Sequence, residues 1–90
     1  MTKHDPTPAH TLADRIAATL YALEANLPLP QLSAAERGLA SAWVLTGMLH
    51  FYAERPALAP MPLAMMHLDA VSVLSNLQEI ATYYKVEVPA

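Results

Sequence analysis

Residues 38–53 read GLASAWVLTGMLHFYA, and this stretch decides the fold because it contains no charged side chain. Its periodicity predicts a helix with apolar side chains on every side rather than along one stripe. Such a helix needs cover all round, and two partner helices in a chain of 90 residues supply little of it. The sequence therefore predicts contact with a second protein, with a copy of the chain, or with lipid. The apolar positions are Leu39, Trp43, Val44, Leu45, Met48, Leu49, Phe51 and Tyr52.

The composition indicates one domain with a thin core and an excess of apolar surface. Hydrophobic residues make up 54% of the chain and charged residues 14%, against about 45–50% and about 25% in typical soluble domains. The net charge of −3 gives no attraction to phosphate backbones, so we expect no nucleic-acid partner. The absence of cysteine excludes disulfides, thiolate catalysis and zinc–thiolate sites. We expect a cytoplasmic protein, since residues 1–8 also lack the apolar stretch of a secretory signal.

The positions of apolar residues and prolines predict an all-α fold, a small bundle of three antiparallel helices completed by oligomerisation or by a partner chain. The helices are expected at about residues 9–26, 34–54 and 62–84, with terminal tails at 1–8 and 85–90. All eight prolines fall outside the interiors of these helices, as expected of residues that break helices. No segment shows the strict alternation of a half-buried strand.

Each expected helix has a start signal and an apolar pattern. The first begins at Thr7 or Thr11 and carries a core stripe at helical spacing. The second begins with Ser33 and Glu36, a pair that forms a capping box. The third follows Pro62 and carries a seam three heptads long. The stripe of the first helix is Leu12, Ile16, Leu20, Leu23 and Leu27, and the seam of the third is Leu63, Met66, Ala70, Val73, Leu77, Ile80 and Tyr84.

Gly47 lies in the middle of the second helix, where glycine costs about 1 kcal/mol relative to alanine. Gly47 and Ala40 are seven residues apart and share one helix face. We expect a packed neighbour to approach closely there. The alternative is a glycine in a loosely packed helix.

Two short segments resemble known families. Residues 32–37, LSAAER, resemble the opening of a LuxR-type helix-turn-helix, but no basic recognition helix follows Gly47. Trp43 and Gly47 are similar to two positions of a tetratricopeptide repeat, but Pro60 and Pro62 would fall inside its second helix and no second copy exists. Neither resemblance implies a function for this chain.

Residues with site chemistry are few. The four histidines include no pair at a helical spacing that would place two imidazoles on one metal, although His50 and His67 could meet between the second and third helices near Asp69. No glycine-rich phosphate loop and no nucleophile–base pair is present. We therefore expect no metal, no cofactor and no enzymatic activity.

A membrane span is not expected, because the uncharged helix of 16 residues is about 24 Å long and a bilayer core is about 30 Å thick. We expect a small helical interaction module, an adapter, assembly factor or inhibitor, that forms a homodimer or covers a larger protein partner. The alternative is a small-molecule binder with a pocket between helices, near Trp43, His50 and Tyr52. The expected interface residues are Val44, Met48, Phe51, Tyr52, Met65 and Leu68, and the expected pocket residues are Trp43, His50 and His67.

Overall fold

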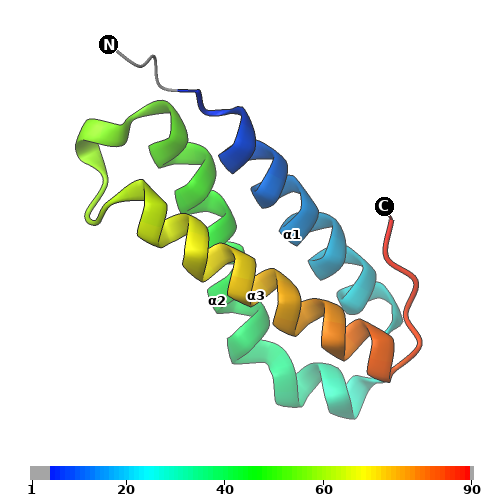
Figure 1. Cartoon of the computed structure of the whole chain (residues 1–90). Coiled ribbons are helices and arrows are strands. Elements are labelled where there is room, and N and C mark those ends of the chain that lie inside the picture. The colour runs from blue at the N-terminus through cyan, green and yellow to red at the C-terminus, as the bar shows by residue number, and fades with distance from the viewer. Residues whose placement is uncertain (1–4, 90) are drawn as a thin grey trace.

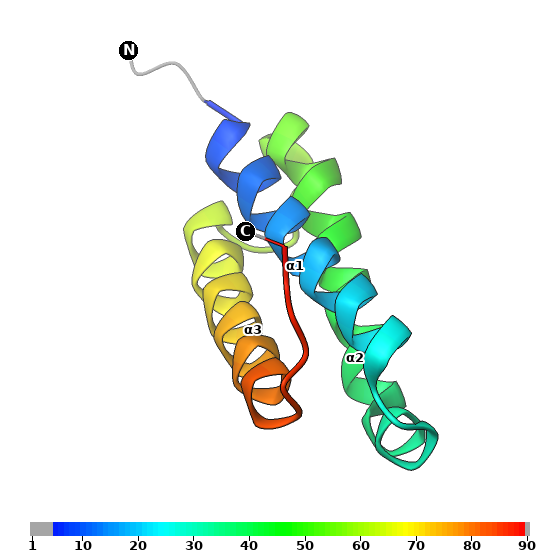
Figure 2. The same ribbon diagram turned by 90° about the vertical axis from the view of Figure 1, so that its right-hand side faces the viewer.

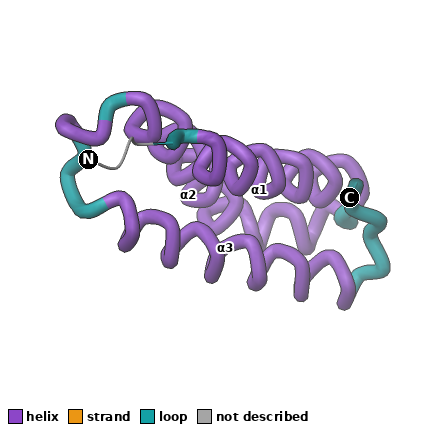
Figure 3. The backbone as a smooth tube through the Cα atoms, turned by 45° about the horizontal axis from the view of Figure 1, so that its top comes forward, coloured by secondary structure: helices purple, strands orange, loops and turns teal. Residues whose placement is uncertain are grey.

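The computed structural model describes residues 5–89, which form three α-helices and one short 3-10 helix (Figure 1). The helices are α1 (Thr7–Asn26), α2 (Leu29–Glu54), η1 (Pro56–Leu58) and α3 (Leu63–Tyr83). Between residues 5 and 89 there is no strand, and the backbone consists of helices and loops alone (Figure 3). The predicted all-α fold of three helices is confirmed.

Helix α1 is the shared packing partner of the other two helices. It contacts both α2 and α3 more extensively than α2 and α3 contact each other. The molecule measures 49 × 24 × 16 Å, and its radius of gyration of 14.0 Å exceeds the roughly 12 Å typical of a compact chain of this length. In this elongated arrangement α2 is covered mainly along the side that faces α1, and its opposite side remains open.

The core consists of one apolar face from each helix. The predicted stripe of α1 is buried from Leu12 to Leu27. Helix α2 contributes Leu39, Ala42 and Leu49, whose spacing of three and seven places them on one side. The predicted seam of α3 is largely confirmed, although Tyr84 is exposed. The buried residues of α3 are Met66, Ala70, Leu74, Leu77 and Ala81.

Helix α2 begins at Leu29, five residues before the expected start, and the predicted capping box at Ser33 and Glu36 is wrong. Pro28 is the N-cap residue with ψ 146°, and the amide of Leu32 donates to its carbonyl oxygen at 2.9 Å. Pro30 lies in the first turn, where a fixed φ suits the helix and no intrahelical donor is lost. Two closely spaced prolines thus start the helix, and Ser33 lies inside it.

The segment after α3 folds back onto the bundle rather than forming the tail that the sequence predicts at residues 85–90. Lys85 adopts φ 57°, the amide of Val86 donates to Ala81 at 2.8 Å and the amide of Lys85 donates to Thr82 at 3.2 Å. These bonds form a Schellman motif. Val86 and Val88 are partly buried against the core, and Figure 2 shows the segment running back beside α1.

At the other end, Thr7 and Pro8 belong to α1, so the expected tail is shorter than predicted. The hydrogen bond from the Thr7 amide to Asp5 Oδ1, 3.0 Å long, satisfies one donor of the first turn. Residues 1–4 of the predicted tail lie outside the described residues, as does residue 90.

Candidate functional site

An exposed apolar stripe runs along the side of α2 that faces away from the core. It consists of Ala40, Val44, Gly47 and Phe51, at spacings of four, three and four, and is called the outer stripe below. Val44 is 63% exposed and Phe51 47% exposed, although both side chains are large and apolar. Large exposed apolar residues that line up on one helix face are typical of a surface that another protein covers.

The structure separates the expected interface residues into two groups. Val44, Phe51, Met65 and Leu68 are exposed. Met48 and Tyr52 are partly buried and pack against the core of the same chain. Only the first group therefore remains available to a partner, on two different helices.

Gly47 has no close neighbour within the chain. A Cβ atom built on Gly47 meets nothing within 4 Å, and the same holds for Gly38. The predicted close approach at Gly47 is therefore absent from the bundle of a single chain. The glycine leaves a gap in the outer stripe between Val44 and Phe51, open to any surface that docks there.

The charges of α2 lie at the two ends of the outer stripe. Glu36 and Arg37 precede it, Glu54 and Arg55 follow it, and all four side chains are exposed. Glu54 pairs with His10 of α1, and the guanidinium of Arg55 lies over the Phe51 ring, 4.5 Å from its centroid. Glu36 and Glu54 are 18 residues apart, about five turns at roughly 3.6 residues per turn, so both carboxylates lie on one flank of the stripe. Arg37 lies on the other flank, about 100° further round the helix, and Arg55, the C-cap residue of α2, lies over Phe51 at the end of the stripe. The stripe thus has an acidic flank and a basic flank.

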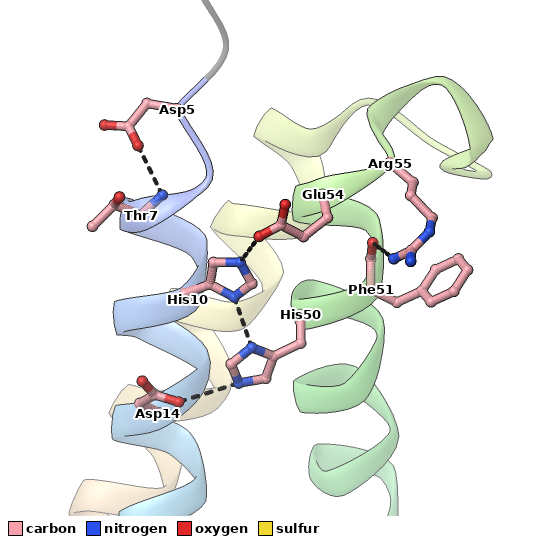
Figure 4. Close-up of polar contacts among 8 residues, drawn as sticks. All are labelled: Asp5, Thr7, His10, Asp14, His50, Phe51, Glu54 and Arg55. Carbon is pink, nitrogen blue, oxygen red and sulfur yellow. Dashed lines mark hydrogen bonds and ion pairs between the residues drawn. The ribbon is translucent and has the colours of Figure 1, made fainter.

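A chain of four polar side chains joins α1 to the last turns of α2 (Figure 4). The Nδ1 atoms of His10 and His50 lie 2.7 Å apart. His10 Nε2 lies 2.8 Å from Glu54 Oε1, and His50 Nε2 lies 3.2 Å from Asp14 Oδ1. The order is Asp14, His50, His10, Glu54, so each imidazole has a carboxylate on one side and the other imidazole on the other.

The chemistry of the imidazole ring decides which atoms of these four side chains donate. Each Nε2 next to a carboxylate carries a proton that it donates to oxygen. A hydrogen bond between the two Nδ1 atoms needs one further proton, which one ring donates and the other accepts. The three contacts together connect α1 and α2 through both imidazole rings.

Trp43 lies in a shallow groove between α1 and α2. Its indole Nε1 donates to Glu24 Oε1 at 2.6 Å, and its ring meets Tyr21 edge to face at a centroid distance of 4.8 Å. Glu24, Leu32 and Glu36 also line this groove. The side chain of Trp43 thus has its polar atom satisfied within the chain.

The expected pocket residues lie in different places. His67 lines a separate groove between α1 and α3, together with Asp5, Arg15 and Val71. His50 contacts His10 on α1 rather than His67. Trp43, His50 and His67 therefore do not line one common pocket.

No family model matches the chain, and no curated protein or solved structure is similar to it at a significant level. Within residues 5–89, no group of three or more His, Cys, Asp and Glu side chains is arranged to hold a metal ion. None of the helices in the described part of the chain combines the length and the apolar character needed to cross a bilayer.

Three residues of the polar chain were not identified from the sequence, namely His10, Asp14 and Glu54. One signal is present in retrospect, since a histidine precedes a carboxylate by four residues both at His10 and at His50. Side chains four residues apart lie on the same helix face. Two such pairs on neighbouring antiparallel helices indicate a polar contact between those helices.

Proposed function

We propose that the chain is a small helical interaction module that works by burying the outer stripe of α2 against another protein surface, without catalysis. The observation that carries the proposal is the exposure of Val44 and Phe51 in a helix whose residues 38–53 carry no charge. Burying apolar surface lowers the free energy by about 25 cal/mol per Å², so a partner that covers these side chains gains affinity. The absence of cysteine suits a protein of the reducing cytoplasm.

The test replaces two stripe residues whose side chains the bundle does not bury. Val44→Glu with Phe51→Glu places two charges on the outer stripe and leaves the core intact. Met48 is a poor choice, because it packs against the core and its replacement would also destabilise the chain. Tyr83→Glu is the matched control, since Tyr83 is 78% exposed on α3, away from the stripe.

The measurement is affinity capture from the native cell, with wild-type and variant chains compared by mass spectrometry. We expect the double variant to lose partners that the wild type and Tyr83→Glu retain, while circular dichroism shows unchanged helix content. Equal capture by the wild type and the double variant would refute the proposal. A small-molecule pocket shared by Trp43, His50 and Tyr52 is not proposed, since Trp43 and His50 lie in different places and Tyr52 packs against the core.

A further inference from the structure

The charges beside the outer stripe discriminate between possible partners. A partner of one charge sign would meet an attractive flank and a repulsive flank at once. A second copy of α2 has one acidic flank and one basic flank, so it can satisfy both when the two helices run in the right relative direction. Charged residues that flank an apolar helix interface set the choice of partner and its orientation in this way.

In a two-fold symmetric pair, the relative direction of the two α2 helices decides which charges face each other. In a parallel pair related by a two-fold axis along the helices, the acidic flank of one helix faces the basic flank of the other. Glu36 then faces Arg37 of the second copy at one end of the stripe, while at the other end Glu54 stays paired with His10 and Arg55 stays over Phe51 of its own chain. In an antiparallel two-fold pair each flank faces the same flank, so Glu36 would oppose Glu54 of the second copy and the charges would repel.

We propose that the occupant of the outer stripe is a second copy of this chain, with the two α2 helices packed in parallel about a two-fold axis. This inference rests on the proposed function, because it names the partner that covers the stripe. Each stripe residue then meets its own copy, and the gap at Gly47 lets the two backbones approach closely. Helices packed at about 8–10 Å place facing Cα atoms about 5 Å apart, within the range that a disulfide bridges.

Single cysteine variants test the orientation directly, since the chain has no cysteine of its own. Ala40 and Phe51 are 11 residues apart, which is about 16 Å along the helix axis. In the parallel pair, Ala40→Cys and Phe51→Cys each meet their own copy, and we expect each variant to form a disulfide-linked dimer alone under mild oxidation. Ser75→Cys, exposed on α3, is the control for random collision and is expected to form no disulfide-linked dimer.

The charge variant Arg37→Glu tests the orientation independently, because the parallel and antiparallel pairs predict opposite changes in the dissociation constant. In the parallel pair it places a carboxylate against Glu36 of the second copy, and we expect the dissociation constant from sedimentation equilibrium to rise about tenfold. In an antiparallel pair it would face Arg55 of the second copy and lower the dissociation constant.

The outcomes separate this inference from the proposed function. Failure of either cysteine variant to cross-link alone, or tighter association of Arg37→Glu, overturns the parallel arrangement. A wild-type chain that stays monomeric at millimolar concentration overturns the second copy as partner. In that case a capture that Val44→Glu with Phe51→Glu abolishes would still support an interaction module with a different partner.

Discussion

The hydrogen bond between the two imidazole rings connects helices whose histidines are 40 residues apart in the chain. Its contribution is modest, because the outer carboxylates are 55% and 72% exposed and water screens their charge. We expect His10→Ala and His50→Ala each to lower the free energy of unfolding, with a coupling energy of about 1 kcal/mol between them. Urea denaturation of the two single variants and the double variant measures this coupling. Strict additivity would show that the rings do not interact in solution.

Lys85 has a left-handed backbone conformation, which costs a residue with a Cβ atom about 1–2 kcal/mol. Glycine is the usual residue at this position of a Schellman motif. We expect Lys85→Gly to raise the free energy of unfolding by about 1 kcal/mol, measured by urea denaturation at low concentration. Lys85→Ala keeps the Cβ atom and is expected to give no such gain. Equal effects of the two substitutions would exclude the backbone explanation.

Helix α2 provides a matched pair of glycines. Gly38 and Gly47 are both exposed, and neither would bring a Cβ atom within 4 Å of a neighbour. They are nine residues apart, so they lie on opposite sides of the helix, and only Gly47 belongs to the outer stripe. We expect either alanine substitution to raise the free energy of unfolding of the dilute chain by about 1 kcal/mol.

The two substitutions are expected to differ in association. Gly47→Ala adds a methyl group where the second copy approaches, so the dissociation constant rises several-fold. Gly38→Ala leaves the dissociation constant unchanged. Light scattering over a concentration series measures the difference, and identical values for both variants would show that nothing docks at Gly47.

The periodicity of α1 predicts its buried face correctly, because all five residues of the predicted stripe, Leu12, Ile16, Leu20, Leu23 and Leu27, are buried. The start of α2 could not be predicted in the same way, because Ser33 with Glu36 and Pro28 with Pro30 both carry start signals. The prolines prevail because they fit the first turn without losing a donor.

The candidate site is harder to predict than the helices. Val44, Met48, Phe51 and Tyr52 are equally apolar in the sequence, and which of them stays exposed depends on the angles at which α1 and α3 meet α2. The contact between His10 and His50 depends on the relative register of two helices. Sequence periodicity describes one helix at a time, so it predicts faces but not how they pair.

At the scale of the whole molecule, the proposed self-association makes the stability of the chain depend on its concentration. A dimer that unfolds to two separate chains is stabilised by mass action, and a 100-fold rise in concentration is worth about 2.7 kcal/mol. Divided between the two chains of the dimer this is about 1.4 kcal/mol per chain, which corresponds to a rise of about 5–10 °C in the midpoint of thermal unfolding. We expect this shift between about 5 and 500 µM wild-type chain, across the concentrations where light scattering reports a dimer.

Val44→Glu with Phe51→Glu supplies the control for this concentration series. The variant keeps the core of the single chain, so it unfolds as a monomer whose midpoint does not depend on concentration. Tyr83→Glu is expected to keep the shift of the wild type. A wild-type midpoint that stays constant over the whole range would mean that the bundle is stable with Val44 and Phe51 exposed. The gap at Gly47 would then carry no packing role between two copies of the chain.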